Sequence, residues 1–410
     1  MCFLVNKDPL SPDKLFFVNC GIYFASLFYD NENVKIHLIF IGICVAAFLG
    51  SCLAFRGAAV KNKYKKEECV KKQTFPFFPV TKIWVASIPA LFCQYYLLNR
   101  FGSFGDYVKA VTLSEKEFAG LGILIWTIKS FSICNIIYFC FLCLKQKVFY
   151  FDKLLYFVHF SIMVFISLLS GSRGTLLVPL FILCFCYHYL KSKISLLKIV
   201  FMCFLLLLCA LVLGVAREGY AVVDGKLTTG LNAKEFSEMF KTAAFYVGTE
   251  PLNLVLKQDG RLYWGATYLS ALTNFVPRNI WPTKPITGGM VLTIDYTGDA
   301  WGGLSYLSTG IIPEAVINFG LAGIGVGLFF IFLINYFLGI KYNQIIKRNY
   351  FCDKQKITKI IIYAYICWGL CSLLVGDFAN IITGTVMNIA IIICIIKFIH
   401  ANLFFRGHQN

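Results

Sequence analysis

The sequence predicts an all-α polytopic membrane protein with about ten spanning helices. The chain of 410 residues is 58% hydrophobic and only 14% charged, and its mean hydropathy is +0.71. Soluble domains contain about 45–50% apolar and about 25% charged residues. A soluble core does not bury so many Phe, Ile and Leu side chains, so lipid must be the solvent for much of the chain.

Ten apolar stretches are long enough to cross a bilayer, and each is bounded by charged residues, glycine or proline. They fall at 14–30, 36–55, 83–98, 119–144, 154–171, 174–190, 196–215, 312–340, 360–376 and 381–399. The first stretch follows a charged, proline-containing start without a small-residue cleavage site. We therefore expect a retained helix there rather than a cleaved signal peptide.

The distribution of cations predicts the orientation of these helices. The chain has 38 Lys and Arg against 21 Asp and Glu, a net charge of +17. One set of loops, at 56–82, 145–153, 191–198 and 341–359, holds 20 of the cations, whereas the opposite short loops hold five. Cytoplasmic loops of membrane proteins collect Lys and Arg. Both termini are therefore expected to be cytoplasmic, and the basic balance reports topology rather than nucleic-acid binding.

One connection is much longer than the others and divides the chain into three parts. Residues 1–215 are expected to hold helices one to seven, 216–311 a large external loop, and 312–410 helices eight to ten with a cytoplasmic C-terminus. Within the loop, apolar spacing predicts amphipathic helices at 236–247 and 262–275. The rest, 277–310, is rich in Gly, Pro, Thr and aromatic residues and is expected to be an ordered loop on the membrane face.

Neither the cysteines nor the histidines indicate a metal or cofactor. Most of the 17 cysteines lie inside apolar stretches, and the Cys140–Cys143 pair encloses Phe and Leu, which favours a packing role. The five histidines are scattered and none lies in the external loop. The glycines at 320–327 stand in a spanning stretch without a preceding strand, so close helix packing is favoured over nucleotide binding.

A proline-rich stretch of the external loop carries two cations and a tryptophan. It reads Asn274-Phe-Val-Pro-Arg-Asn-Ile-Trp-Pro-Thr-Lys-Pro285. The prolines restrict the backbone, so Arg278 and Lys284 are expected to project from a stiff platform with Trp281 between them. A guanidinium suits phosphate and an ammonium adds a point charge, and an indole face packs against sugar rings. The alternative is a rigid lid anchored by an interfacial aromatic residue.

Three further arginines are candidate contacts for an anionic ligand. Arg173 stands in the external hairpin 170–174, where a cation opposes the positive-inside trend, although a snorkelling arginine is the alternative. Arg217 closes the seventh helix at the depth of Arg173, where it either shares one ligand with Arg173 or simply stops the helix. Arg261 follows Asp259-Gly260, a pattern that also favours a turn.

Glu314 is the leading candidate for a catalytic carboxylate. It follows Pro313 at the start of an apolar stretch, at or just below the membrane surface. A carboxylate there is costly unless it is paired, hydrated or functional, and desolvation raises its pKa towards that of a useful base. The alternative is an acidic residue placed at a helix N-terminus by the helix dipole. Asp295 and Asp299 are rival bases.

The order of these features resembles the Wzy family of O-antigen and oligosaccharide repeat-unit polymerases. The Ser172-Arg173-Gly174 hairpin comes first, then the large external loop with the 276–285 stretch, then Ile312-Pro-Glu-Ala-Val-Ile-Asn-Phe-Gly320. By motif, the resemblance covers most of 150–330; elsewhere it rests on topology alone. It implies a GT-C-like membrane fold and an inverting, metal-independent glycosyltransferase of the bacterial inner membrane.

The resemblance also implies a reaction and a set of roles. The growing glycan moves from undecaprenyl diphosphate to the non-reducing end of the next lipid-linked repeat at the periplasmic face. Glu314 orients or deprotonates the acceptor hydroxyl, and positive charge stabilises the departing diphosphate. The catalytic residues implied are Glu314 and Arg278, and the residues for diphosphate and glycan binding are Arg173, Arg217, Lys284, Trp281, Arg261 and Asp299.

The implied partners are undecaprenyl-diphosphate-linked repeats and the lipid bilayer, with a chain-length regulator protein as a candidate; no cofactor, metal or nucleic acid is expected. Two alternatives stay open. An O-antigen ligase shares the architecture and the donor, but ligases typically carry a functional histidine in the large loop. A lipid-oligosaccharide flippase or other transporter usually shows short external loops and broken helices with polar residues at mid-membrane depth.

Overall fold

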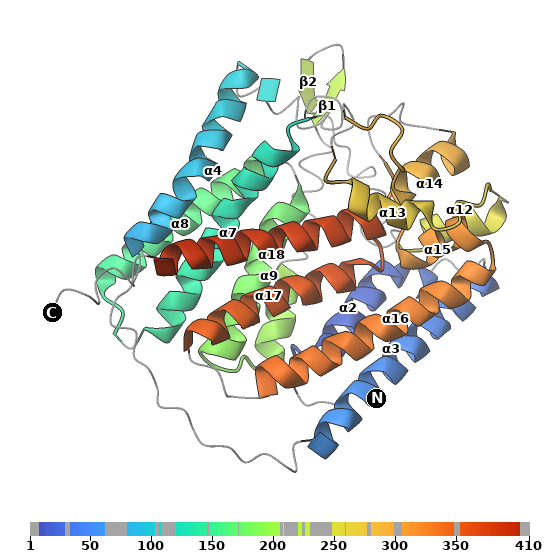
Figure 1. Ribbon diagram of the computed structural model, residues 1–410, viewed down its shortest axis with the longest axis horizontal. Helices are drawn as coiled ribbons and strands as arrows, with labels where there is room; N and C mark the ends of the chain where they lie inside the picture. Colours follow the sequence, from blue (N-terminus) through green and yellow to red (C-terminus); the bar gives the residue numbers. More distant parts are fainter. Residues whose placement is uncertain are drawn as a thin grey trace. The chain divides into compact units, whose positions relative to one another are not determined.

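The computed structural model of the chain describes residues 8–28, 33–61, 80–102, 106–107, 118, 120–145, 147–170, 172–205, 208, 220–223, 226–229, 248–258, 260–276, 280–298, 306–347 and 353–401. Within these ranges the chain is helical apart from one short antiparallel hairpin (Figure 1). The helical class predicted from the sequence is thereby confirmed in outline.

The chain divides into two compact units. Unit 1 comprises Met1–Glu67, Leu211–Lys347 and Ile366–Thr385, and unit 2 comprises Glu68–Ala210, Arg348–Tyr365 and Val386–Asn410. The elements of unit 1 are α2 (Pro12–Tyr23), η1 (Ala25–Phe28), α3 (Val34–Lys61), β1 (Tyr220–Val223), β2 (Lys226–Thr229), α12 (Glu250–Lys257), α13 (Ala266–Thr273), α14 (Gly288–Thr297), α15 (Ile311–Phe319), α16 (Ala322–Tyr342) and the π-helical turn Asn343–Lys347. Those of unit 2 are α4 (Val80–Arg100), α7 (Gly122–Leu144), α8 (Tyr150–Leu169) and α9 (Arg173–Leu190). Two helices, α17 (Asp353–Ser372) and α18 (Phe378–Ala401), contribute to both units.

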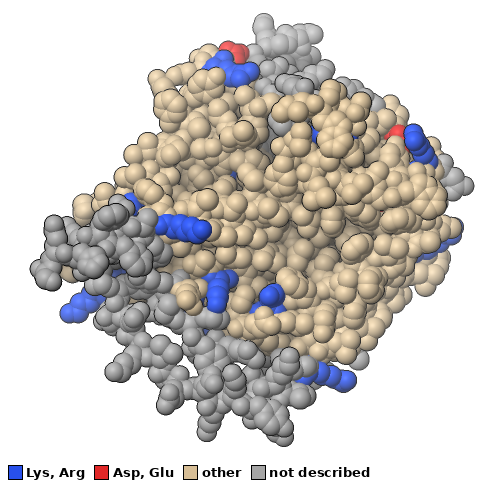
Figure 2. Space-filling model, viewed as in Figure 1, with Lys and Arg blue, Asp and Glu red and all other residues tan. Residues whose placement is uncertain are grey.

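Five helices in the described ranges are long and apolar enough to cross a bilayer. They are Val34–Arg56, Gly122–Leu144, Tyr150–Leu169, Ala322–Ile346 and Phe378–Ile399. Each overlaps a stretch predicted from the sequence, so the chain is a membrane-embedded protein. The space-filling view agrees, since uncharged residues predominate on the face it shows (Figure 2). The count of ten spans and the sidedness of the loops remain predictions.

The stretch predicted as one span at 312–340 is divided in the structure. Gly320 adopts φ +62°, a conformation that glycine reaches without strain, and it ends α15 before α16 begins. The short α15 then folds back along the first turns of α16, with Ile312 against Gly327 and Ala315 against Gly323. A Cβ at Gly323 would clash with the Ala315 carbonyl, which confirms the packing role predicted for the glycines at these two positions.

The spans α3 and α16 lie side by side in unit 1 (Figure 1). Gly42 faces Leu328, Gly50 faces Phe332 and Gly339 faces Ala54, so residue numbers rise together and the two helices are parallel. Small residues let helix backbones approach closely inside a membrane. The parallel arrangement brings the C-terminal ends of both helices, each of which carries cations in the sequence, to the same end of the pair.

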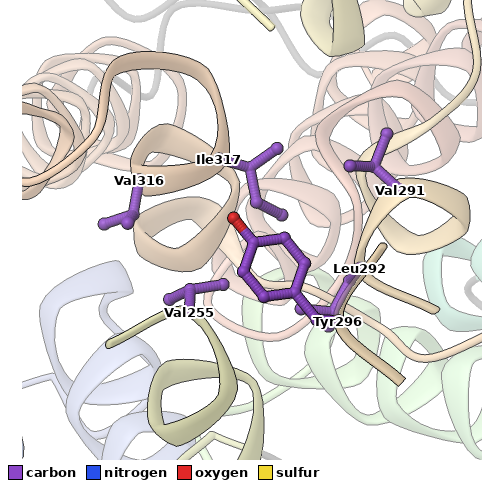
Figure 3. Packing of buried hydrophobic residues seen from close by; sticks show 6 residues of the cluster. All are labelled: Val255, Val291, Leu292, Tyr296, Val316 and Ile317. Atoms are coloured by element: carbon purple, nitrogen blue, oxygen red, sulfur yellow. The ribbon is translucent and has the colours of Figure 1, made fainter. Parts of the chain in front are cut away.

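The short helices α12 to α15 gather at the other end of the α3–α16 pair (Figure 1). Their shared core is an apolar cluster from three helices, with the Tyr296 ring at its centre (Figure 3). Its members are Val255 of α12, Val291, Leu292 and Tyr296 of α14, and Val316 and Ile317 of α15.

The helix α14 corrects one prediction, because it lies inside the segment 277–310 that the composition describes as a loop. Thr287 caps its first turn by accepting a hydrogen bond from the Met290 N–H at 3.5 Å, and Gly298 ends it with φ +65°. Burial of Val291 and Leu292 in the cluster stabilises a helix that its local sequence alone does not.

Candidate functional site

The arginines on which the sequence prediction depends are not placed by the structure. Arg217, Arg278 and Asp299 lie outside the described residues. Arg173 begins α9 in unit 2, whereas Glu314 belongs to unit 1. The predicted grouping of guanidinium groups therefore stays a prediction, and the site is built from the residues of unit 1.

The carboxyl group of Glu314 is completely buried in unit 1. Its Oε2 accepts a hydrogen bond from the Phe378 N–H at 2.8 Å and lies 3.5 Å from the Thr309 hydroxyl oxygen. Its Oε1 has no hydrogen-bond partner among the described residues. A buried carboxylate with one unsatisfied oxygen is costly, so this arrangement favours a protonated group or one that exchanges a proton.

The chain delivers Glu314 to this position through a tight contact at the start of α15. Gly310 adopts φ +78° and lies so close to the Leu374 carbonyl that a Cβ there would clash. The Ile311 N–H donates to the Leu373 carbonyl at 2.8 Å. The turn between α17 and α18 is thus joined by its backbone to the turn that precedes Glu314.

That turn supplies a second buried carboxylate, Asp377, which the sequence did not suggest as a site residue. Its Oδ1 accepts hydrogen bonds from the Thr309 N–H at 3.3 Å and from the Thr309 hydroxyl at 3.2 Å. Its Oδ2 accepts from the Asn380 amide at 3.0 Å. The only signal in the sequence is an isolated acid between two apolar stretches, a pattern that equally indicates a helix N-cap. Asp377 does precede α18 directly.

Two glycines of α14 close over the carboxyl groups. A Cβ at Gly288 would lie 2.6 Å from the Glu314 carboxyl carbon and 2.9 Å from Oε1. A Cβ at Gly289 would lie 2.8 Å from both carboxyl oxygens of Asp377. Any side chain at either position would press on a carboxyl group. The Gly288–Gly289 pair follows directly on the proline-rich stretch, so the platform predicted to bind substrate leads into the cover of the acidic pair.

Burial sets the protonation of this pair. It raises the pKa of Glu314 to about 7, and the nearby charge of Asp377 raises it further, whereas the Phe378 N–H and the hydroxyls of Thr267 and Thr309 lower it. Burial also raises the pKa of Asp377, against hydrogen bonds from Thr309, Thr287 and the Gly289 backbone. Two like charges that both contact the Thr309 side chain disfavour double ionisation. The pair can therefore hold or release one proton near neutral pH, which general acid–base chemistry requires.

Lys284 makes contacts within the protein that the sequence did not predict. Its ammonium is buried and donates to the carbonyls of Thr273 at 3.3 Å and Val276 at 2.8 Å. These carbonyls belong to the end of α13, where a cation is favourable. A diphosphate would have to compete with these carbonyls for the ammonium.

Trp281 and Arg261 are exposed, as a contact with substrate requires. The Arg261 guanidinium lies 5.8 Å from the centre of the Tyr263 ring, and the Tyr263 hydroxyl donates to Asp295 at 2.8 Å. Burial and the Asp295 carboxylate raise the pKa of Tyr263 to about 12. Asp295 is thus held at the surface by a phenol, apart from the hydrogen bonds of Glu314.

Among the described residues no group of three or more His, Cys, Asp and Glu is placed to hold a metal ion. The fold defines the class of the protein, a helical membrane protein with a buried acidic pair beside its spans. No family model, curated protein or solved structure matches the chain. The resemblance to Wzy polymerases therefore rests on the sequence motifs alone.

Proposed function

We propose that this chain is a membrane-embedded polymerase that transfers a growing glycan from undecaprenyl diphosphate to the next lipid-linked repeat. The observation that supports the proposal most is Glu314, whose pKa of about 7 and unpartnered Oε1 suit a general base. The sequence motifs supply the substrate class, and the structure supplies a carboxylate with matching chemistry.

In the proposed step the hydroxyl oxygen of the acceptor attacks the anomeric carbon of the donor glycan. The bond from that carbon to the diphosphate oxygen breaks, and the diphosphate leaves with the electron pair. Glu314 takes the hydroxyl proton on Oε1, and Asp377 disfavours the charged form of Glu314 so that its pKa stays near neutral. The predicted arginines, Arg173, Arg217 and Arg278, stabilise the charge on the leaving diphosphate.

This step requires the cover of Glu314 to move. The carboxyl group is fully buried, and Gly288 lies directly against Oε1. Since Gly288 follows the stretch that carries Trp281 and Lys284, binding of substrate to that stretch would draw the cover away. Closed sites that open with a loop are common among enzymes that exclude water from the reaction.

A transporter of lipid-linked oligosaccharide is the second candidate. Acidic groups buried beside interrupted helices serve as proton sites in transporters, and α15 is a short helix that folds back on the α16 span. The polymerase is preferred because the acidic pair adjoins the stretch that resembles a glycan-binding platform.

The test is the surface polysaccharide of a bacterial strain that lacks this chain and is complemented with the wild type or with variants. A polymerase predicts single repeats in the deletion strain and in strains with Arg278→Ala or Arg173→Ala, provided that each variant is present in the membrane at the wild-type level. Unattached lipid-linked polymer would instead identify a ligase, and repeats retained inside the cell would identify a flippase. Normal chain lengths in both arginine variants would overturn the diphosphate site.

A further inference from the structure

The helix α13 has its polarity reversed relative to a helix that faces water. Its buried side consists of Thr267 and Ser270, both 0% exposed, and Ala271. Its outer side consists of Leu269 and Leu272, which are 57% and 74% exposed. An amphipathic helix on a soluble protein turns its leucines inward. Small and polar residues inside with leucines outside are instead typical of helices packed in lipid.

The polar side chains on the inner face of α13 are satisfied within the protein. The Asn318 amide donates to the Thr267 hydroxyl at 2.7 Å, and Ser270 donates to the carbonyl of Thr267. The Thr383 hydroxyl of α18 donates to the Ala271 carbonyl at 3.2 Å. The orientation of α13 is thus fixed by hydrogen bonds, and the leucines are not turned outward by chance.

Two contacts give the depth of α13 along candidate membrane spans. The Tyr268 ring lies 6.0 Å from the Phe330 ring of α16 and 5.0 Å from the Phe378 ring of α18. Phe330 is eight residues into the span that begins at Ala322, and Thr383 is five residues into the span that begins at Phe378. At about 1.5 Å per residue, α13 lies beside the first 8–12 Å or so of both spans. A bilayer that contains these spans also reaches α13.

The flanking residues extend the apolar surface. No charged residue or histidine occurs among the 15 positions from Leu262 to Val276. The exposed apolar residues on and around α13 are Leu262, Trp264, Leu269, Leu272, Phe275, Ile280 and Trp281. We name this set the α13 surface. Its two tryptophans belong to the residue type that is enriched where membranes meet water.

We propose that the α13 surface is embedded in one leaflet of the bilayer and contacts phospholipid acyl chains, so that α13 is a membrane-inserted half-helix rather than part of a water-exposed loop. Lipid is preferred over a protein partner because the depth beside α16 and α18 places the leucines where acyl chains lie. The proposal goes beyond the polymerase activity and holds or fails independently of it.

The test is photo-cross-linking of the purified full-length chain in vesicles of phosphatidylethanolamine and phosphatidylglycerol. The photoreactive residue p-benzoylphenylalanine replaces Leu269 or Leu272, one at a time. Phe329, which is exposed on the α16 span, is the positive control, and Gln258, which is exposed after the end of α12, is the negative control. No glycan substrate is present, so the outcome does not depend on the proposed enzymatic function.

Phospholipid adducts at positions 269 and 272 should form in yields similar to that at 329 and at least about tenfold above that at 258. Yields no higher than at 258 would overturn the proposal. Adducts to a second copy of the chain would do so as well, because they would make the surface a self-association interface.

Fluorescence provides a measurement that does not rely on the photoreactive residue. Trp264→Phe should remove more of the emission that brominated phospholipids quench than of the emission that aqueous iodide quenches. The reverse result would place Trp264 in water and contradict the proposal.

Discussion

His159 and Glu314 are both fully buried titratable side chains, and they lie in different units of the molecule. In unit 2, the His159 Nε2 lies 3.0 Å from the Ser87 hydroxyl and Nδ1 lies 2.9 Å from the Asn135 amide. The Phe131 ring stacks on the imidazole with centroids 4.3 Å apart. Both ring nitrogens are satisfied, and the apolar rings around them leave a neutral histidine as a packing group.

Glu314 is surrounded differently. One of its oxygens is unpartnered, a second carboxylate shares its threonine, and glycines rather than aromatic rings cover it. The difference shows that burial alone does not mark a functional group. A satisfied buried group stabilises the fold, whereas an incompletely satisfied one can exchange a proton. The predictions below separate these two roles.

The largest expected effect is on activity in Glu314→Gln. The amide retains the size of the side chain and an acceptor for the Phe378 N–H but cannot take a proton. Loss of a general base lowers the rate by about 10²–10⁴-fold, measured as polymer formed per protein molecule. The thermal stability of the variant should not fall, because a buried charge is removed. Wild-type turnover in Glu314→Gln would move the base to Asp295, Asp299 or the substrate itself.

His159→Ala should show the opposite combination. It leaves the Ser87 hydroxyl and the Asn135 amide without the imidazole and opens a cavity beside Phe131, which together cost about 2–4 kcal/mol. The free energy of unfolding in mild detergent should fall, whereas the specific activity of the folded fraction should be unchanged. A specific activity as low as that of Glu314→Gln would assign His159 to the chemistry.

Gly288→Ala tests the close cover of Glu314. The added methyl group would overlap the carboxyl group, and such overpacking costs about 1–3 kcal/mol. Activity should fall together with stability. Gly325→Ala is the matched control, because a Cβ at that helical glycine meets no atom within 4 Å. Equal losses in both variants would show that the contact with Glu314 is not responsible.

The smallest expected effect is a shift in pH dependence in Asp377→Asn. A general base must be deprotonated, so the wild-type activity should rise as the pH increases through about 7, the pKa of Glu314. The negative charge of Asp377 contributes to that pKa, and its removal should move the acidic limb of the activity profile to lower pH. An unchanged profile would show that the two carboxylates titrate independently.

Some of the site was predictable because it depends on local sequence. Glu314 after Pro313 at the start of an apolar stretch was sufficient to suggest a carboxylate near the membrane surface, and the structure places it in a short helix beside a span. Asp377 was not predictable, since an isolated acid before a helix is also a common cap. The convergence of the arginines remains a prediction from sequence.

Composition and the lengths of apolar stretches determined that the chain is a helical membrane protein, because backbone groups in lipid must be satisfied within each segment. Tertiary structure decided which residues meet. Glu314 and Phe378 are 64 positions apart, and they are joined only because Gly310 lets the start of α15 approach the α17–α18 turn. The reversed polarity of α13 was equally hidden, since the sequence shows its leucines but not which side of the helix the protein covers.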